Sequence, residues 1–121
     1  MNKENHLFQM GIKAFNEERF YDAHEYWEEL WLDYKLIDAK FIQGLIQLAV
    51  SYFHLFNNNI NGSRSMIKKS LTKFIGFDIE RKINVHKLID IVTNVEKHLN
   101  EISGCPDFNK EYIIKINFIN E

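Results

Sequence analysis

The side chains best suited to chemistry in this chain fall on two short stretches with helical spacing. His24 and Glu28 lie four residues apart, and Gln43, Gln47 and His54 follow at intervals of four and seven. At about 100° per residue, these intervals bring side chains to one face of a helix. An imidazole beside a carboxylate is suited to proton transfer, and amides are suited to orienting a ligand by hydrogen bonds. The sequence therefore predicts two polar stripes on successive helices.

Both stripes border strongly apolar positions. The stretch from Phe41 to Phe56 is apolar almost all round, which is typical of a central helix packed on several sides. The first stripe adjoins Trp27 and Trp31, and Tyr52 lies near the second. A buried polar group without a partner costs about 1 to 3 kcal/mol. We therefore expect the two helices to pack together, with their polar groups hydrogen-bonded across a seam lined by tryptophan.

Three interpretations of this seam stay open. It could be a structural network that fixes helix register, a ligand pocket with tryptophan walls, or a metal or catalytic centre. In the last case His24 is the base or ligand and Glu28 its orienting carboxylate. The donors for a metal are few, because the segment 41–57 has no carboxylate and the string HEYWE lacks the second histidine of a zinc-protease motif. The sequence therefore predicts neither a metal nor another cofactor.

The elements that position these stripes follow from apolar residues spaced by three and four. This periodicity predicts about five helices, at 5–16, 22–34, 39–57, 63–75 and 85–102. Asp22 and Glu25 have the spacing of a capping box, Asn84 is suited to cap the fifth helix, and Arg64 is expected on an exposed face. The closing segment EYIIKINFIN predicts an extended tail laid against the bundle. The predicted fold class is all-α: a compact helical bundle with a short extended C-terminal tail.

Composition restricts the partners. The chain of 121 residues is predicted to form one domain, 1–121, with net charge -2 and a pI of about 6.2. This charge disfavours nucleic acid, and no apolar stretch is long enough to span a membrane. The single cysteine, Cys105, and the lack of a signal-peptide pattern predict a cytoplasmic location. The apolar tail leaves a homo-oligomer open.

Two resemblances bear on the fold. The first helices are similar in shape to tetratricopeptide hairpins, without their regular period. The segments FNEERFYDAHEYWEELW and FIQGLIQLAVSYFHLFNNN, followed by GSRS, resemble the small helical family named domain of unknown function 309, most strongly over 13–74. The motif residues matched are Ala23, His24, Glu25, Glu28 and Trp31 on one helix and Gln43, Gly44 and Gln47 on the next. The resemblance implies a compact multihelical domain and no particular activity.

Together these observations predict a binding or protein-interaction module that uses the polar seam to recognise a small ligand or a protein segment. The alternative is a metal-assisted or His/Glu-dependent hydrolase. The candidate binding residues are His24, Glu25, Trp27, Glu28, Trp31, Gln43, Gln47, Tyr52 and His54.

Overall fold

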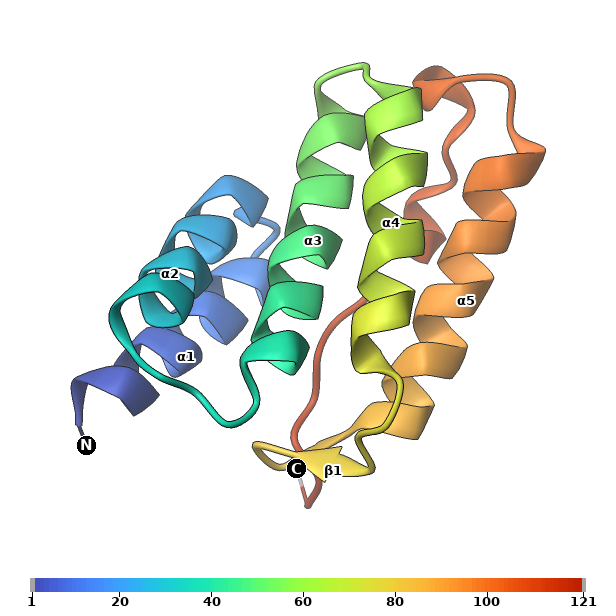
Figure 1. Cartoon of the computed structure of the whole chain (residues 1–121). Helices are drawn as coiled ribbons and strands as arrows, with labels where there is room; N and C mark the ends of the chain where they lie inside the picture. Colours follow the sequence, from blue (N-terminus) through green and yellow to red (C-terminus); the bar gives the residue numbers. More distant parts are fainter. Residues whose placement is uncertain (1, 121) are drawn as a thin grey trace.

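The computed structural model describes residues 2–120 and contains five α-helices. They are α1 (Lys3–Asn16), α2 (Phe20–Asp33), α3 (Ala39–Phe56), α4 (Ile60–Phe74) and α5 (Val85–Glu101). In Figure 1, the α1–α2 hairpin lies on one side of α3, and α4 and α5 lie on the other. The prediction of an all-α bundle with about five helices is confirmed. No helix within residues 2–120 combines the length and apolar character needed to cross a membrane.

The position of α3 at the centre follows from its composition. Phe41, Leu45 and Leu48 are fully buried, and so are Trp27 on α2 and Phe74 on α4. Gly44 lets α4 approach closely, because a Cβ at this position would lie 2.6 Å from the Phe74 ring. A helix that packs on both sides needs apolar residues around most of its circumference, so α3 forms the core that holds α2 and α4 in place.

Short polar side chains determine where two of the helices begin. The Asn59 side chain accepts a hydrogen bond from the Gly62 backbone N–H at 2.9 Å, so α4 begins at Ile60 rather than at the expected residue 63. Asn84 accepts from the Lys87 N–H at 3.1 Å and caps α5, as predicted. Asn residues in the string NNNING therefore start a helix as well as form a turn.

The predicted capping box of α2 is wrong. The helix begins at Phe20, its N-cap residue is Arg19, and this residue makes no side-chain capping bond. Asp22 lies inside the first turn, where its carboxylate accepts from Arg19 Nη1 at 3.0 Å. An acidic residue in the first turn still favours the helix through its dipole. Glu25 is consequently exposed on the helix surface and not used as a cap.

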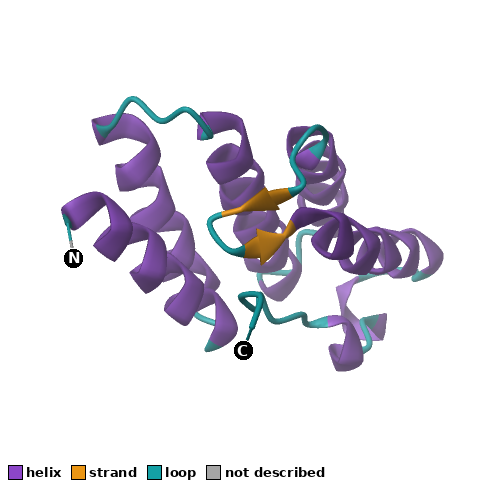
Figure 2. Ribbon diagram, turned by 90° about the horizontal axis from the view of Figure 1, so that it is seen from below, coloured by secondary structure: helices purple, strands orange, loops and turns teal. Residues whose placement is uncertain are grey.

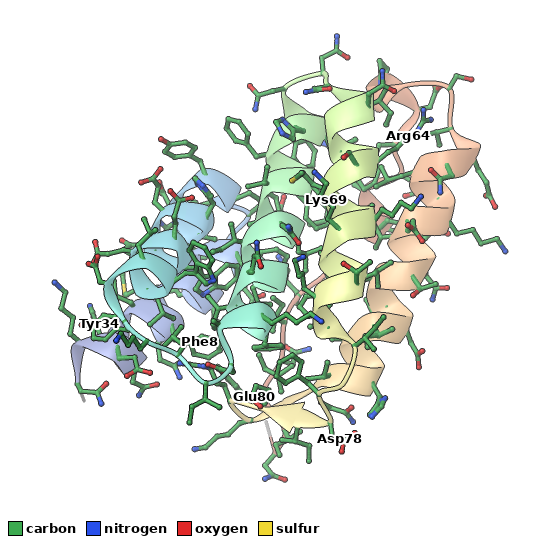
Figure 3. All side chains as sticks on the ribbon, in the orientation of Figure 1. Phe8, Tyr34, Arg64, Lys69, Asp78 and Glu80 are labelled. Carbon is green, nitrogen blue, oxygen red and sulfur yellow. The ribbon has the colours of Figure 1, made fainter. Side chains whose placement is uncertain are left out.

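Arg64 also differs from expectation, because it is not a free surface charge. Its guanidinium donates to the backbone carbonyls of Leu99 at 2.9 Å and Ile102 at 2.7 Å. These carbonyls lie at the C-terminal end of α5, where the backbone has no partners within the helix. Arg64 therefore joins α4 to the end of α5, as its position in Figure 3 shows.

A short β-hairpin lies between α4 and α5 and was not predicted from the sequence. Strands β1 (Ile79–Glu80) and β2 (Ile83–Asn84) pair antiparallel. Arg81 and Lys82 form the two-residue turn with φ angles of 49° and 63°. Hairpin turns with positive φ at both positions favour Asn-Gly or Asp-Gly. Arg-Lys lacks that signature, so the hairpin was missed.

The C-terminal segment follows α5 through two 3₁₀ turns, η1 (Cys105–Asp107) and η2 (Lys110–Tyr112). It then runs back along the bundle as an extended chain, and its end lies near the hairpin (Figure 2). Ile114 and Ile116 are buried against the core. The predicted extended tail laid on the bundle is thus confirmed.

Candidate functional site

The two ionisable residues of the first polar stripe lie together on α2. His24 Nε2 is 2.8 Å from Glu28 Oε2, one helical turn away, and His24 Nδ1 is 3.7 Å from Glu25 Oε1. The His24 side chain is 20% exposed and that of Glu28 is 48% exposed. The pair forms because residues four apart meet on a helix surface. Its geometry is that of an imidazole oriented by a carboxylate at the edge of the core.

His24 faces the C-terminal half of α3, because α2 and α3 run in opposite directions. The imidazole lines a small cavity of about 150 Å³ together with Tyr21, Val50, Phe53 and His54. The Tyr21 and Phe53 rings lie 5.5 Å apart between centroids, and the Tyr21 and His24 rings lie 5.7 Å apart. Aromatic rings therefore form most of the walls of this cavity.

A second hollow of about 440 Å³ adjoins the first and shares Tyr21 and Phe53 with it. Phe20 and Phe56 add further aromatic walls, and their rings stack at 6.0 Å between centroids. Tyr21 is 54% exposed and Phe56 is 48% exposed. We call the surface formed by Tyr21, His24, Phe53, His54 and Phe56 the aromatic face.

The rim of the aromatic face is acidic. Glu18 and Asp22 line the second hollow, and Glu25 and Glu28 flank His24, whereas Arg19 is the one basic residue lining that hollow. The Glu25 carboxylate next to the Tyr21 hydroxyl raises the pKa of Tyr21 above its ordinary value. The surface thus combines exposed aromatic rings with predominantly negative charge.

The two glutamines of α3 do not join His24 and Glu28. The Gln47 Oε1 atom is buried without a hydrogen-bond partner, and between residues 2 and 120 no hydrogen bond links either glutamine to the α2 pair. Glu28 is already bonded to His24, and the antiparallel packing places His24 beside Val50 and Phe53. The expected hydrogen-bonded seam between the helices is therefore not formed, although Gln43 and Gln47 lie on the same side of α3 as His54.

Two of the aromatic residues predicted to line the seam point elsewhere. Trp27 is fully buried, and its indole N–H donates to the Phe8 carbonyl of α1 at 3.2 Å. The hydroxyl of Tyr52 donates to the Tyr112 carbonyl of the C-terminal segment at 2.6 Å. Both are core residues whose polar atoms join separate elements. Trp31, at 38% exposed, is the tryptophan that reaches the surface of α2.

His54 lines the small cavity, but its ring is weakly held. Its Nδ1 atom lies 3.5 Å from the side-chain amide of Asn59, at the limit of a hydrogen bond. Gly62 at the start of α4 lies close to the same ring, because a Cβ at this position would meet His54 Cδ2 at 2.9 Å. Contact with the α3–α4 turn thus positions His54 more than polar bonding does.

A more buried polar cluster was missed by sequence reasoning. Arg81 donates to Asp38 twice, from Nε to Oδ2 at 2.7 Å and from Nη2 to Oδ1 at 3.1 Å. The guanidinium also lies 3.4 Å from Glu4 and 4.9 Å from the centre of the Phe8 ring. Asp38 and Arg81 are 43 positions apart. No local pattern could have paired them, because the missed hairpin brings Arg81 to the α2–α3 loop.

Burial and neighbouring charge shift both acids of this cluster. Burial opposes ionisation of Asp38, but the bidentate bond from Arg81 offsets it, so the pKa of Asp38 lies below its ordinary value. Burial, together with the adjacent Asp38 carboxylate, raises the pKa of Glu80. Glu80 lies on the hairpin at the lower end of the molecule in Figure 3. The Asp38–Arg81 cluster therefore fastens the hairpin to the start of α3.

The donor geometry does not favour a metal centre in the part of the chain described. Within residues 2–120, no group of three or more His, Cys, Asp or Glu side chains is arranged to hold a metal ion. His24, Glu25 and Glu28 all belong to one helix, and His54 across the cavity contributes an aromatic wall. A site assembled from this face would bind by shape and hydrogen bonding.

Comparison with known proteins adds one match. The model of the family described as "Domain of unknown function (DUF309)" matches residues 8–66. This segment includes most of α1, all of α2 and α3 and the first half of α4, and it contains the whole aromatic face. No curated protein matches the chain.

Proposed function

This chain belongs to the domain of unknown function 309 family, and we propose that it is a protein-binding module whose aromatic face receives an apolar side chain from a partner segment. The observation that carries this proposal is the pair of adjoining hollows on either side of Tyr21 and Phe53. Exposed aromatic rings next to such hollows are typical of the anchor positions of protein interfaces. The cytoplasmic location predicted from the single cysteine remains part of this proposal.

The size of the hollows favours a protein segment over a small molecule. Pockets for drug-sized ligands measure about 300 to 1,000 Å³ and enclose most of the ligand. The cavity beside His24 measures about 150 Å³, which suits one side chain, and its larger neighbour is open to solvent. A partner segment that places one side chain in the small cavity and covers the open hollow with a second side chain would match the volumes of both.

The acidic rim specifies the chemistry of the partner. Glu25 and Glu28 carry negative charge beside His24. The other two carboxylates of the rim are paired, Asp22 with Arg19 at 3.0 Å and Glu18 with Lys115 at 3.7 Å, and both pairs are exposed enough to exchange partners. Complementary charge accelerates association and excludes wrong partners more than it strengthens a complex. We therefore expect a partner segment with an aromatic or branched apolar anchor flanked by lysine or arginine.

The His/Glu hydrolase alternative has one supporting observation, the 2.8 Å contact between His24 and Glu28. Acyl transfer also needs a nucleophile within hydrogen-bond reach of the imidazole. In the described chain both His24 ring nitrogens face carboxylates, and the residues lining its cavity include no serine, threonine or cysteine. The geometry thus supports binding better than nucleophilic catalysis.

A peptide-selection experiment tests the proposed function. Random peptides displayed on phage would be selected on the wild-type chain, and synthetic versions of the enriched sequences would be measured by calorimetry. We expect an apolar anchor with basic flanks, and a loss of affinity of at least about tenfold for Tyr21→Ala or Phe53→Ala, as for an interface anchor. Ile79→Ala is the matched control, because Ile79 is 59% exposed on the hairpin.

Two results would count against the proposal. Enriched peptides that bind Tyr21→Ala and the wild type equally would place the binding site elsewhere. Repeated selections without enrichment would show that the chain does not bind such peptides. Binding that weakens as salt rises would support the acidic rim, because exposed charges are screened at high ionic strength.

A further inference from the structure

The C-terminal tail, residues 113–119, is held by side chains of the bundle as a bound peptide would be. The Asn16 side-chain amide donates to the Ile116 carbonyl at 2.9 Å and accepts from the Ile116 N–H at 2.8 Å. One amide therefore satisfies both backbone groups of one residue. An adjacent β-strand would supply the same two bonds, so Asn16 of α1 takes the place of a missing strand.

The side chain of Tyr52 likewise makes two hydrogen bonds to the backbone, at the beginning of the tail. The Tyr52 hydroxyl donates to the Tyr112 carbonyl at 2.6 Å and accepts from the Ile114 N–H at 3.3 Å. Burial holds the pKa of Tyr52 far above its ordinary value, so this hydroxyl keeps the proton that it donates. At the far end, the Ile119 N–H donates to the Lys82 carbonyl of the hairpin at 2.7 Å. Groups from α1, α3 and the hairpin thus recognise an extended main chain.

The side chains of the tail enter the bundle at alternate positions. Ile114 and Ile116 are 8% and 3% exposed, and the Phe118 ring lies 6.3 Å from the Phe8 ring. The residues between them, Lys115 and Asn117, are exposed. This is the period of an extended chain bound on one face. All the main-chain hydrogen bonds described for residues 114–119 go to partners outside the tail, so the tail of another copy could make every one of them.

The tail fits its groove incompletely near its end. A cavity of about 280 Å³ lies between the tail and the Ile83, Leu88 and Ile91 side chains. A second, of about 470 Å³, lies beside Phe118 on the hairpin side. Unfilled volume of this kind forfeits packing contacts. The last residues of the tail therefore make fewer packing contacts than Ile114 and Ile116.

The connector between α5 and the tail would have to change its course in an exchange of tails. Residues 102–109 carry no α-helix or strand, and Gly104 is fully extended with φ of -170° and ψ of 177°. A tail that left the groove would expose an apolar channel and an apolar segment on the same molecule. Two molecules in that state can bind each other, because the tail of each one fits the groove of the other.

We propose that the groove formed by α1, α3, α5 and the hairpin binds the C-terminal tail of a second copy of this chain, giving a dimer with exchanged tails. The bound contacts are those described above, made between molecules instead of within one. The exchange has a cost in lost translational freedom, so the dimer accumulates at raised protein concentration.

A complementation experiment tests this exchange. Ile116→Asp gives a chain with an intact groove and a tail that cannot enter it. Asn16→Ala combined with Tyr52→Phe gives a chain with an intact tail and a groove that lacks the side-chain hydrogen bonds to the tail backbone. Each chain alone should sediment as a monomer, and their equimolar mixture should sediment at roughly twice the monomer mass, as a dimer joined by one intact tail–groove pair. Asn117→Asp, which adds the same charge at an exposed tail position, should leave wild-type behaviour unchanged.

The outcomes separate clearly. A mixture that stays at monomer mass, with both chains folded by circular dichroism, overturns the exchange. Dimers of Ile116→Asp alone overturn it too, because they form without the tail. Should either variant fail to fold, native mass spectrometry of wild-type chains with light and heavy isotopes replaces the mixture. Concentrated wild-type samples should give mixed dimers, and monomers at every concentration would overturn the proposal.

Discussion

Two polar regions of this molecule have opposite constructions. The Asp38–Arg81 cluster joins the hairpin, the α2–α3 loop and α1, and the Asp38 side chain is 9% exposed. The His24–Glu28 pair comes from one turn of α2, and the Glu28 side chain is 48% exposed. The Asp38–Arg81 cluster joins elements that are distant in the chain, whereas the His24–Glu28 pair links residues of a single helix.

This difference indicates which region is available for function. A buried charge pair is strongly destabilising to break, because the remaining charge loses its partner in a medium of low dielectric constant. An exposed pair contributes about 0 to 1 kcal/mol and is free to exchange partners. The Asp38–Arg81 cluster therefore maintains the fold, and the aromatic face around His24 is the region that can change its contacts without unfolding the chain.

The largest expected effect comes from breaking the buried cluster. Asp38→Ala should lower the free energy of unfolding by about 3 kcal/mol, because Arg81 is left buried without its bidentate partner. Urea unfolding followed by circular dichroism measures the loss. The double variant Asp38→Leu/Arg81→Leu is the control and should lose less, since neither charge remains. Equal losses for both would mean that packing, rather than charge, holds the hairpin.

The same cluster should make stability depend on pH at the acid end. The pKa of Asp38 is lowered in the folded chain from its usual value of 3.8. Its ionised form therefore contributes stability above about pH 3.8, and this contribution is lost as the pH falls through the lower folded value. Thermal unfolding between pH 2 and pH 6 should show a steeper fall for the wild type than for Asp38→Asn. Parallel curves would contradict the assignment.

Glu80 should act in the opposite direction. Its pKa is raised in the folded chain from 4.5, so ionising it costs stability as the pH rises through the raised value. Glu80→Gln should therefore be more stable than the wild type at neutral pH, and the two should converge below about pH 4.5. Melting temperatures across this range measure the difference. A variant less stable than the wild type at pH 7 would show that the Glu80 carboxylate supports the cluster.

The glutamines of α3 should give smaller changes in stability. Gln47→Leu should leave the free energy of unfolding unchanged or raise it by up to about 1 kcal/mol, because it removes a buried carbonyl that has no partner. Gln43→Leu on the same helix face is the comparison, since Gln43 is half-buried like Gln47 but has no side-chain oxygen or nitrogen buried without a partner. Chemical unfolding measures both. A loss of more than about 2 kcal/mol for Gln47→Leu would indicate a hydrogen-bond partner that the fold supplies in solution.

The smallest expected effect is the coupling between the two polar stripes. In a double-mutant cycle of His24→Ala and Gln47→Leu, the effects should add to within about 0.5 kcal/mol, because no hydrogen bond joins these residues. His24→Ala paired with Glu28→Ala is the control and should show coupling, since these side chains lie 2.8 Å apart. Strong coupling between His24 and Gln47 would show that the two residues interact across a polar seam between α2 and α3.

Much of the fold was predictable because its signals are local. The apolar stripe Phe8, Gly11, Ile12 and Phe15 is buried in α1 as its spacing indicates. Asn84 caps α5, and the alternating tail lies extended on the bundle. The start of α2 and the hairpin turn at Arg81 and Lys82 were not found, because tertiary contacts hold them and their residues carry no capping or turn signature.

The candidate site was predictable only in part. His24 and His54 were correctly placed on the facing sides of α2 and α3, because helical periodicity determines which side chains share a face. Trp27 and Tyr52 were assigned to the same seam, yet one bonds to α1 and the other to the tail. Periodicity gives the angle of a side chain around its own helix but not the identity of the element opposite.

The sequence by itself determined the all-α class, the central position of α3 and the His24–Glu28 pair, since each depends on residues a few positions apart. Only the tertiary structure decided that Asp38 meets Arg81, that Asn16 holds Ile116, and that the aromatic face is open. These contacts join residues 43 and 100 positions apart. Such pairings depend on how whole elements pack, because burial of apolar surface is non-directional and local spacing does not encode its partner.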